Sequence, residues 1–193
     1  LTAAAELFTT RGYAATTTRA VAERAGMRQA TMYHYVAGKE DLLAELLEST
    51  VTPSLALAGR LLADEARRAG ALLVHFSTDY VFDGAARTPY DEDAPANPLN
   101  VYGASKLAGE RAVAASGACA LTLRTSWVYG LRGGNFLLTI RRLAAERAEL
   151  RIVADQAGVP NWCRALAEAT TAIVAQGRAA VAERAGLYHL CAA

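Results

Sequence analysis

Two residues of this 193-residue chain have the type and spacing of an acid–base pair. Tyr102 and Lys106 stand four positions apart, which places both on one face of a helix. Reduction of a carbonyl by hydride needs a proton for the developing alkoxide, and an unperturbed tyrosine, with a pKa of about 10, is a poor donor near pH 7. A neighbouring ammonium lowers that pKa because it stabilises the phenolate. The pair therefore indicates carbonyl reduction, although the spacing also fits a surface tyrosine beside a solvated lysine.

Two hydroxyl side chains stand where such a reaction would need a hydrogen bond to the substrate oxygen. Ser77 and Thr78 directly follow the apolar run 72–76, which is typical of a buried strand. An α/β sheet binds its ligands at the carboxyl edge of the strands. Only two of the twenty basic residues are lysines, Lys39 and Lys106, so an ammonium at either place is a distinct choice over the guanidinium used elsewhere.

The elements that must position these residues form two regions with different patterns. Residues 1–58 read as all-helical, whereas strands and helices alternate after about residue 59, which predicts a parallel sheet with crossover helices. Strands are predicted at 72–76, 121–127 and 150–153, and helices at 60–69, 101–115, 135–147 and 162–175. The predicted fold class is therefore α/β, with a Rossmann-like parallel sheet preceded by a small all-α helix-turn-helix domain.

The first region has the layout of a helix-turn-helix. A helix through about Ala25, a turn at Gly26 and a short helix over 28–35 are followed by a helix from Lys39 that Pro53 ends or interrupts. In such a unit the second helix enters the major groove of DNA, and a lysine at the next helix start adds a phosphate contact. Basic and acidic side chains nearly balance here, so we expect weak DNA binding with a shallow salt dependence.

Composition limits the remaining function classes. With 53% hydrophobic residues and a net charge of +1, the chain can bury a core and is not a strongly basic nucleic-acid binder. No apolar run reaches the roughly 18 residues of a membrane span, and no leader pattern opens the chain. Three scattered cysteines argue against a disulfide framework or a zinc site, so we assign no metal ligands and expect a cytoplasmic location.

The N-terminal segment over about 2–47 resembles the DNA-binding domain of TetR-family repressors, and the resemblance lies in AAELFTTRGYAATTTRAVAERAGMRQATMYHYVAGKEDLLAELL. By that resemblance, the side chains that would face DNA are Thr18, Arg19, Gln29, Thr31, Tyr33, His34, Tyr35 and Lys39. Repressors of this type read paired half-sites as dimers. The alternative is that Tyr33 and Tyr35 belong partly to the core and that the segment is an inert remnant.

The region over about 62–190 resembles the dTDP-4-dehydrorhamnose reductase family of extended short-chain dehydrogenases/reductases. The resemblance lies in LLVHFSTDYVFDG, PYDEDAPANPLNVYGASKLAGERAV, LRTSWVYG, NFLLTIRRLAAERAELRIVADQAGVPNW and GLYHL. It implies NADPH or NADH as the hydride donor, admits Mg²⁺, and implies a dTDP-4-keto-6-deoxy sugar as substrate. The implied roles are catalytic for Thr78, Tyr102 and Lys106, cofactor-binding for Ser77, Tyr102 and Lys106, and substrate-binding for Asp79, Tyr80 and Trp127.

Two departures from the reductase pattern modify these expectations. No glycine-rich turn of the kind that binds a cofactor pyrophosphate precedes the first strand, so we expect an incomplete sheet with an uncovered edge. Asn161 stands where the family usually has threonine. We accordingly predict two domains, 1–58 and 59–193, and low reductase activity. The alternatives are a TetR-type regulator and an inactive fused or truncated product, and the sequence leaves the oligomeric state open.

Overall fold

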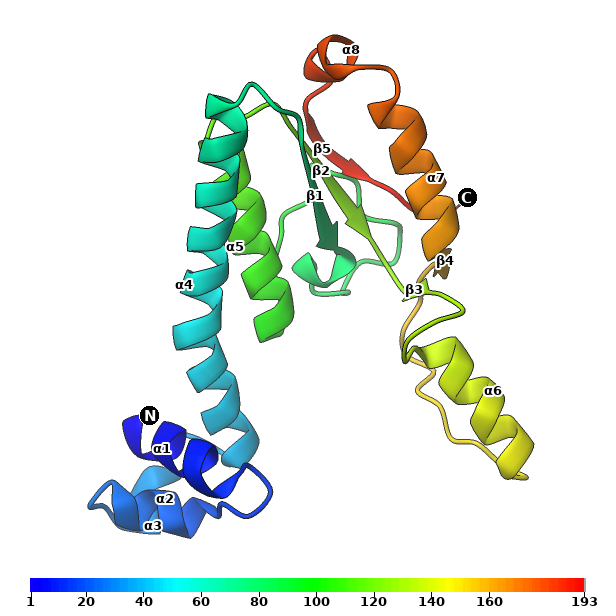
Figure 1. Ribbon diagram of the computed structural model, residues 1–193. Coiled ribbons are helices and arrows are strands. Elements are labelled where there is room, and N and C mark those ends of the chain that lie inside the picture. Colours follow the sequence, from blue (N-terminus) through cyan, green and yellow to red (C-terminus); the bar gives the residue numbers. More distant parts are fainter. Residues whose placement is uncertain (193) are drawn as a thin grey trace.

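The computed structural model describes residues 1–192, apart from the side chains of residues 51 and 52 (Figure 1). The helices are α1 (Thr2–Arg11), α2 (Thr18–Arg24), α3 (Gln29–Met32), α4 (Lys39–Arg68), η1 (Asp79–Val81), α5 (Val101–Ala115), α6 (Phe136–Glu146), α7 (Cys163–Val174) and α8 (Arg178–Ala182). The strands are β1 (Leu73–Thr78), β2 (Ala120–Thr125), β3 (Val128–Tyr129), β4 (Asn161–Trp162) and β5 (Gly186–His189). The α/β class and the helical N-terminal segment are both confirmed.

The N-terminal helices close a core of their own. Thr17 caps α2 by accepting a hydrogen bond from the Ala20 backbone N–H at 3.2 Å. Gly26, at φ 70°, provides the left-handed residue of the turn between α2 and α3. The buried residues come from α1, α2, α3, the connection between α3 and α4, and the start of α4. They are Ala4, Leu7, Val21, Ala22, Met32, Val36 and Leu42. This segment therefore completes its packing mainly with neighbours that are close in sequence.

A single 30-residue helix, α4, connects this unit to the sheet. The expectation that Pro53 ends or interrupts the helix is wrong, because the helix continues to Arg68. Proline removes one N–H donor and crowds one carbonyl of the preceding turn, and here its side chain is exposed. Ser54 Oγ donates to the Thr50 carbonyl at 2.7 Å, so a side chain adds a bond to the helix beside the proline. The predicted boundary at 58/59 falls inside α4, and the division into two domains stays a prediction.

The sheet is parallel, with the strand order β1-β2-β5. Thr78 at the end of β1 is paired with Thr125 at the end of β2. Strand β5 was not among the predicted strands, whereas the strand predicted at 150–153 is absent from the structure. Residues 150–153 take part in no strand pairing, and a largely apolar segment does not form a strand without a neighbouring backbone. Among the described residues no strand pairs with the outer edge of β1, so this edge of the sheet is unpaired there.

Helices cover the two faces of the sheet, and the alternation of β2 residues separates the two layers. Ala120 packs with Ala63 of α4 and Val113 of α5, and these two helices lie side by side (Figure 1). Leu121 packs with Val181 of α8 on the opposite face. Because β1 and β2 are parallel and Thr78 is paired with Thr125, the carboxyl ends of the two strands lie side by side at one end of this three-layered region.

Candidate active site

The carboxyl end of β1 places two buried hydroxyls at the edge of the sheet. Thr78 Oγ1 donates to Asp79 Oδ1 at 3.0 Å and accepts from the Tyr80 backbone N–H at 3.3 Å, which caps η1. Ser77 Oγ is buried and has no hydrogen-bond partner among the described residues. An unsatisfied buried hydroxyl is costly, and such groups concentrate where a ligand completes the bonding.

Helix α5 carries Tyr102 and Lys106 to the same place. Asn100 fixes the start of the helix, because its Oδ1 accepts from the Gly103 N–H at 2.7 Å. A Cβ atom at Gly103 would lie 2.0 Å from the Tyr80 carbonyl oxygen, so only glycine lets α5 approach η1 this closely. The rings of Tyr80 and Tyr102 consequently meet edge to face, with centroids 5.9 Å apart.

Lys106 lies against the end of β1 while Tyr102 faces solvent. The Lys106 ammonium donates to the Phe76 carbonyl, directly before Ser77. Burial lowers the pKa of Lys106, and the Glu110 carboxylate opposes that shift. The Tyr102 side chain is 56% exposed, so its hydroxyl is open to a ligand. The structure thus brings a lysine, a tyrosine and the Ser77–Thr78 pair to one strand end. Their roles in binding and catalysis stay predictions.

Trp127 follows the end of the neighbouring strand β2, two residues beyond Thr125. Its backbone has φ 41°, the left-handed region, which costs a non-glycine residue about 1–3 kcal/mol. The indole packs on Gly158, where a Cβ would lie 2.8 Å from Cε2. Trp127 remains 42% exposed. The β1–β2 register therefore puts a strained, partly exposed aromatic residue at the same sheet edge as Thr78.

Sequence reasoning missed a buried ion pair beneath this edge. The Arg124 guanidinium donates to both carboxylate oxygens of Glu110, at 2.9 and 2.7 Å. The same guanidinium lies over the Phe82 ring, and Glu92 Oε1 accepts from the His189 backbone N–H at 2.9 Å. These contacts fasten α5 and the loop after η1 to the sheet. The available signal was an arginine in the middle of the predicted strand 121–127, since a buried arginine requires an acidic partner.

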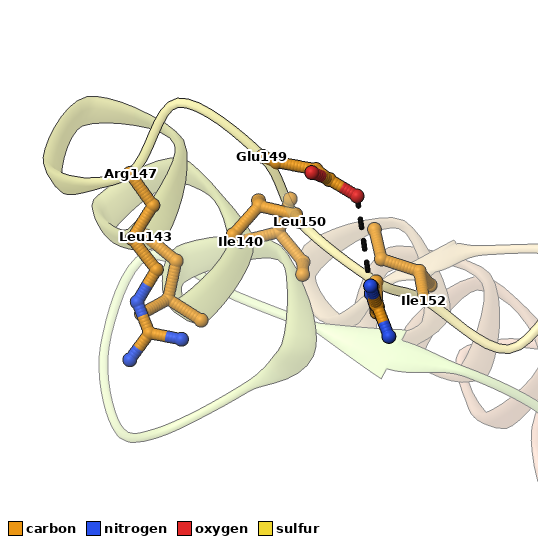
Figure 2. Close-up of a pocket in the computed structure, with 7 residues that line it drawn as sticks. Ile140, Leu143, Arg147, Glu149, Leu150 and Ile152 are labelled. Atoms are coloured by element: carbon orange, nitrogen blue, oxygen red, sulfur yellow. Dashed lines mark ion pairs between the residues drawn. The ribbon is translucent and has the colours of Figure 1, made fainter.

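Two cavities in the described part of the chain lie away from these residues. One has a volume of about 370 Å³ and lies between α6 and the following segment, where Figure 2 shows Ile140 and Leu143 facing Leu150 and Ile152. The Glu149–Arg151 ion pair, at 3.8 Å, flanks it. The other, about 290 Å³, lies beside β2, β5 and α8. Neither cavity is lined by the candidate catalytic residues, so the chemistry of the β1 end, rather than the depth of a pocket, defines the candidate site.

Three of the predicted DNA-facing residues form one hydrogen-bonded group across α2 and α3. Gln29 Nε2 donates to Thr18 Oγ1 at 3.0 Å and to the Tyr33 hydroxyl oxygen at 3.3 Å. Thr18 Oγ1 and the Tyr33 hydroxyl oxygen are themselves hydrogen-bonded at 3.2 Å. These hydrogen bonds lower the pKa of Tyr33 because they stabilise the phenolate. The group fixes the angle between the two helices and leaves half of the Tyr33 side chain exposed.

The other predicted DNA contacts are less organised. Arg19 is exposed and paired with Glu23 at 2.9 Å. The Lys39 ammonium donates to the Tyr13 carbonyl at 3.0 Å and lies over the Tyr13 ring, so it is partly engaged within the chain. Thr31 and His34 are exposed, and Tyr35 is 76% exposed, which argues against the reading of Tyr35 as core.

Two classes of site are not found in residues 1–192. The histidine, cysteine and acidic side chains described there form no group of three that could hold a metal ion. None of the described helices is both long and apolar enough to cross a membrane.

Two known families match different parts of the chain. Residues 43–193 match the family described as RmlD substrate binding domain. The chain belongs to this family. Residues 1–46 match a second family, bacterial regulatory proteins of the tetR family. The two matches overlap over residues 43–46, within the first turns of α4. Both resemblances drawn from the sequence are confirmed.

Similar proteins share the C-terminal region. The chain is 52% identical to a dTDP-4-dehydrorhamnose reductase from Burkholderia thailandensis over 69% of this chain and 46% of that protein. It is 44% identical to the reductase of Shigella flexneri over 81% of this chain and 50% of that protein. The structure of the Bacillus anthracis reductase in complex with NADP superposes with a TM-score of 0.63 at 38% identity, covering 71% of this chain and 47% of that one. The chain thus spans about half the length of these relatives.

Proposed function

We propose that the C-terminal region reduces the C4 ketone of a dTDP-4-keto-6-deoxy sugar, with NADPH or NADH as the hydride donor. The observation that carries this proposal is the approach of α5 to η1 at Gly103, because it brings Tyr102 and Lys106 to the end of β1. The similarity to reductases, one of them solved in complex with NADP, supports the same chemistry. A metal is no part of the proposal, since neither the described residues nor these relatives' names point to Mg²⁺.

Each residue has a distinct role in this proposal. The nicotinamide, when bound, supplies the hydride. The Tyr102 hydroxyl donates a proton to the C4 oxygen. The Thr78 hydroxyl, whose one proton points to Asp79 Oδ1 in the free chain, turns to donate a hydrogen bond to the same C4 oxygen. The Lys106 ammonium stabilises the phenolate left on Tyr102, and its two remaining protons are available to the nicotinamide ribose. Asp79, Tyr80 and Trp127 line the place of the sugar nucleotide.

The residues present fit one end of the cofactor better than the other. The unsatisfied Ser77 hydroxyl and the ammonium of Lys106 lie at one strand end and suit the polar nicotinamide ribose. The segment directly before β1 consists of α4 and a short turn. It provides no glycine-rich loop to hold a pyrophosphate. We infer that this chain by itself binds the cofactor weakly and turns over slowly.

Titration of the purified chain with NADPH, followed by nicotinamide fluorescence, tests the proposal. We expect weak saturable binding that Lys106→Ala weakens further. Tyr102→Phe should weaken NADPH binding less than Lys106→Ala does and lower turnover of a dTDP-4-keto-6-deoxy sugar by about 10²–10⁴-fold, the range for loss of a general acid. Tyr35→Phe, an exposed tyrosine of the helical unit, is the matched control. Turnover that survives Tyr102→Phe would refute the assignment of the acid.

A second function, DNA binding, is favoured by the hydrogen-bonded group of Thr18, Gln29 and Tyr33. This group presents polar and aromatic atoms at the surface of α2 and α3, where a helix-turn-helix contacts base edges and phosphates. We expect weak affinity, because the segment is nearly neutral. Fluorescence anisotropy with a palindromic duplex at several salt concentrations measures it, and Gln29→Ala should reduce it. Tight binding by the parent chain would contradict the expected weakness.

A further inference from the structure

Four parts of the C-terminal region meet at one buried side chain, Asn161, which is 1% exposed. Its Nδ2 donates to the Ser126 carbonyl at 2.6 Å and to the Val159 carbonyl at 2.8 Å, and lies 3.2 Å from Ser126 Oγ. Its Oδ1 accepts from the Ala192 backbone N–H at 2.6 Å. One amide therefore bonds the turn after β2, the loop before β4 and the segment after β5, while its own backbone lies in β4.

The same residue reaches Trp127 through the backbone. The Asn161 N–H donates to the Trp127 carbonyl at 3.2 Å. The side-chain amide holds the carbonyl of Ser126, so both peptide groups that flank the Trp127 Cα accept hydrogen bonds from Asn161. Fixing both peptides fixes φ and ψ of the residue between them, and here that residue has the unfavourable φ of 41°.

A close contact on the other side sets the direction of the indole. The ring lies on Gly158, where no side chain is present to displace it. Ser126 Oγ in turn donates to the Val159 carbonyl at 3.0 Å, which joins the two loops next to this contact. The 158–161 loop therefore restrains the Trp127 ring from one side, while the residue stays 42% exposed.

We propose that Asn161 is a positioning residue that keeps Trp127 in its left-handed conformation and so presents the partly exposed indole to the sugar nucleotide. The role of the indole rests on the reductase function proposed above. A threonine at this position has a single hydroxyl proton, so it could not donate to both carbonyls while also accepting from Ala192. The amide thus gives this chain a more completely fixed turn than a hydroxyl would.

Fluorescence of Trp127 tests the positioning directly. The chain has two tryptophans, so the substitution Trp162→Phe leaves Trp127 as the sole emitter. In that background, Asn161→Thr and Asn161→Leu should raise the acrylamide quenching constant, by at most about twofold because the side chain is already 42% exposed. Asn135→Thr is the matched control, since Asn135 caps α6 and threonine also caps helices. Circular dichroism verifies that every variant is folded.

Titration with dTDP separates this inference from the function on which it rests. We expect saturable quenching of Trp127 by dTDP in the Trp162→Phe chain, an affinity loss of about tenfold in Asn161→Thr, and no change in Asn135→Thr. Unchanged acrylamide quenching in folded Asn161 variants would overturn the positioning role, and so would unchanged dTDP affinity. If acrylamide quenching rises in the Asn161 variants but the parent chain binds no dTDP, the proposed substrate is refuted and the link from Asn161 to Trp127 stands.

Discussion

The helical unit at the N-terminus and the sheet region stabilise themselves in different ways. The helical unit has one apolar core formed by helices that are close in sequence. The sheet region divides its apolar contacts among three small clusters and adds a buried arginine–glutamate pair and a buried asparagine. One apolar core thus joins the helices of the first region, whereas in the second region polar contacts between distant segments supplement the small apolar clusters. Substitutions should therefore affect the two regions separately.

The largest effect is expected from breaking the buried ion pair. Arg124→Met leaves the Glu110 carboxylate buried without its partner, which costs about 3–5 kcal/mol. Hydrogen exchange should show faster exchange in β1, β2 and α5, with protection in α1 and α2 unchanged. The double variant Arg124→Met/Glu110→Leu removes both charges and should regain most of the loss. Equal loss of protection in the helical unit would show that the two regions unfold together.

The reciprocal test removes apolar volume from the helical unit. Leu7 is buried in its single core, so Leu7→Ala should destabilise this unit by about 3 kcal/mol, within the range for leucine truncation. Hydrogen exchange should then be faster in α1 to α3 and unchanged in the sheet. Leu47→Ala, at an exposed position of α4, is the control for the loss of leucine itself.

A smaller effect is expected from a substitution at Gly103, where the backbones of α5 and η1 are in contact. Gly103→Ala places a methyl group on the Tyr80 carbonyl oxygen, and the overpacking should cost about 1–3 kcal/mol as α5 moves away from η1. The proposed reductase turnover should fall with it, because Tyr102 and Lys106 move with the helix. Gly134→Ala meets no atom within 4 Å and should be silent in both thermal unfolding and turnover.

The smallest effect concerns the loop after η1 at low pH. Hydrogen bonds from the Ala85 N–H, the Tyr90 hydroxyl and the Asn97 amide hold the pKa of Asp83 at about 2, below its ordinary 3.8. A lowered carboxyl pKa stabilises the fold above pH 3.8, and this contribution disappears as the pH falls through about 2. Asp83→Asn should flatten that part of the acid profile, followed by near-ultraviolet circular dichroism. An unchanged profile would show that the loop does not contribute.

Local signals in the sequence predicted part of the fold correctly. Helix α5 begins and ends where expected, because Asn100 caps it and its apolar spacing is regular. The strand expected at 72–76 overlaps β1. The strand expected at 150–153 failed because pairing depends on a neighbouring backbone that the run itself cannot indicate. The expected stop at Pro53 failed because a helix can tolerate the loss of one hydrogen bond.

In the candidate site, too, local features could be predicted from the sequence, whereas contacts between distant elements could not. The spacing of Tyr102 and Lys106 predicted that they share a helix face. The predicted parallel sheet placed Thr78 at the carboxyl end of a strand, where such sheets bind ligands. The approach of α5 to η1 at Gly103 could not be predicted, because it depends on atoms from two separate elements. The bonds of Asn161 to Ser126 and Ala192 are of the same kind, since the partners lie 35 and 31 residues away.

The length of α4 gives the proline inside it a mechanical meaning. Thirty residues at 1.5 Å each make a rod of about 45 Å, and Pro53 stands about 21 Å from its N-terminal end. A bend of about 20° at that residue would carry the helix-turn-helix through about 7 Å. Base pairs are stacked about 3.4 Å apart, so the same bend equals roughly two steps along a duplex. A change of angle in the middle of α4 would thus reach DNA as a change of register.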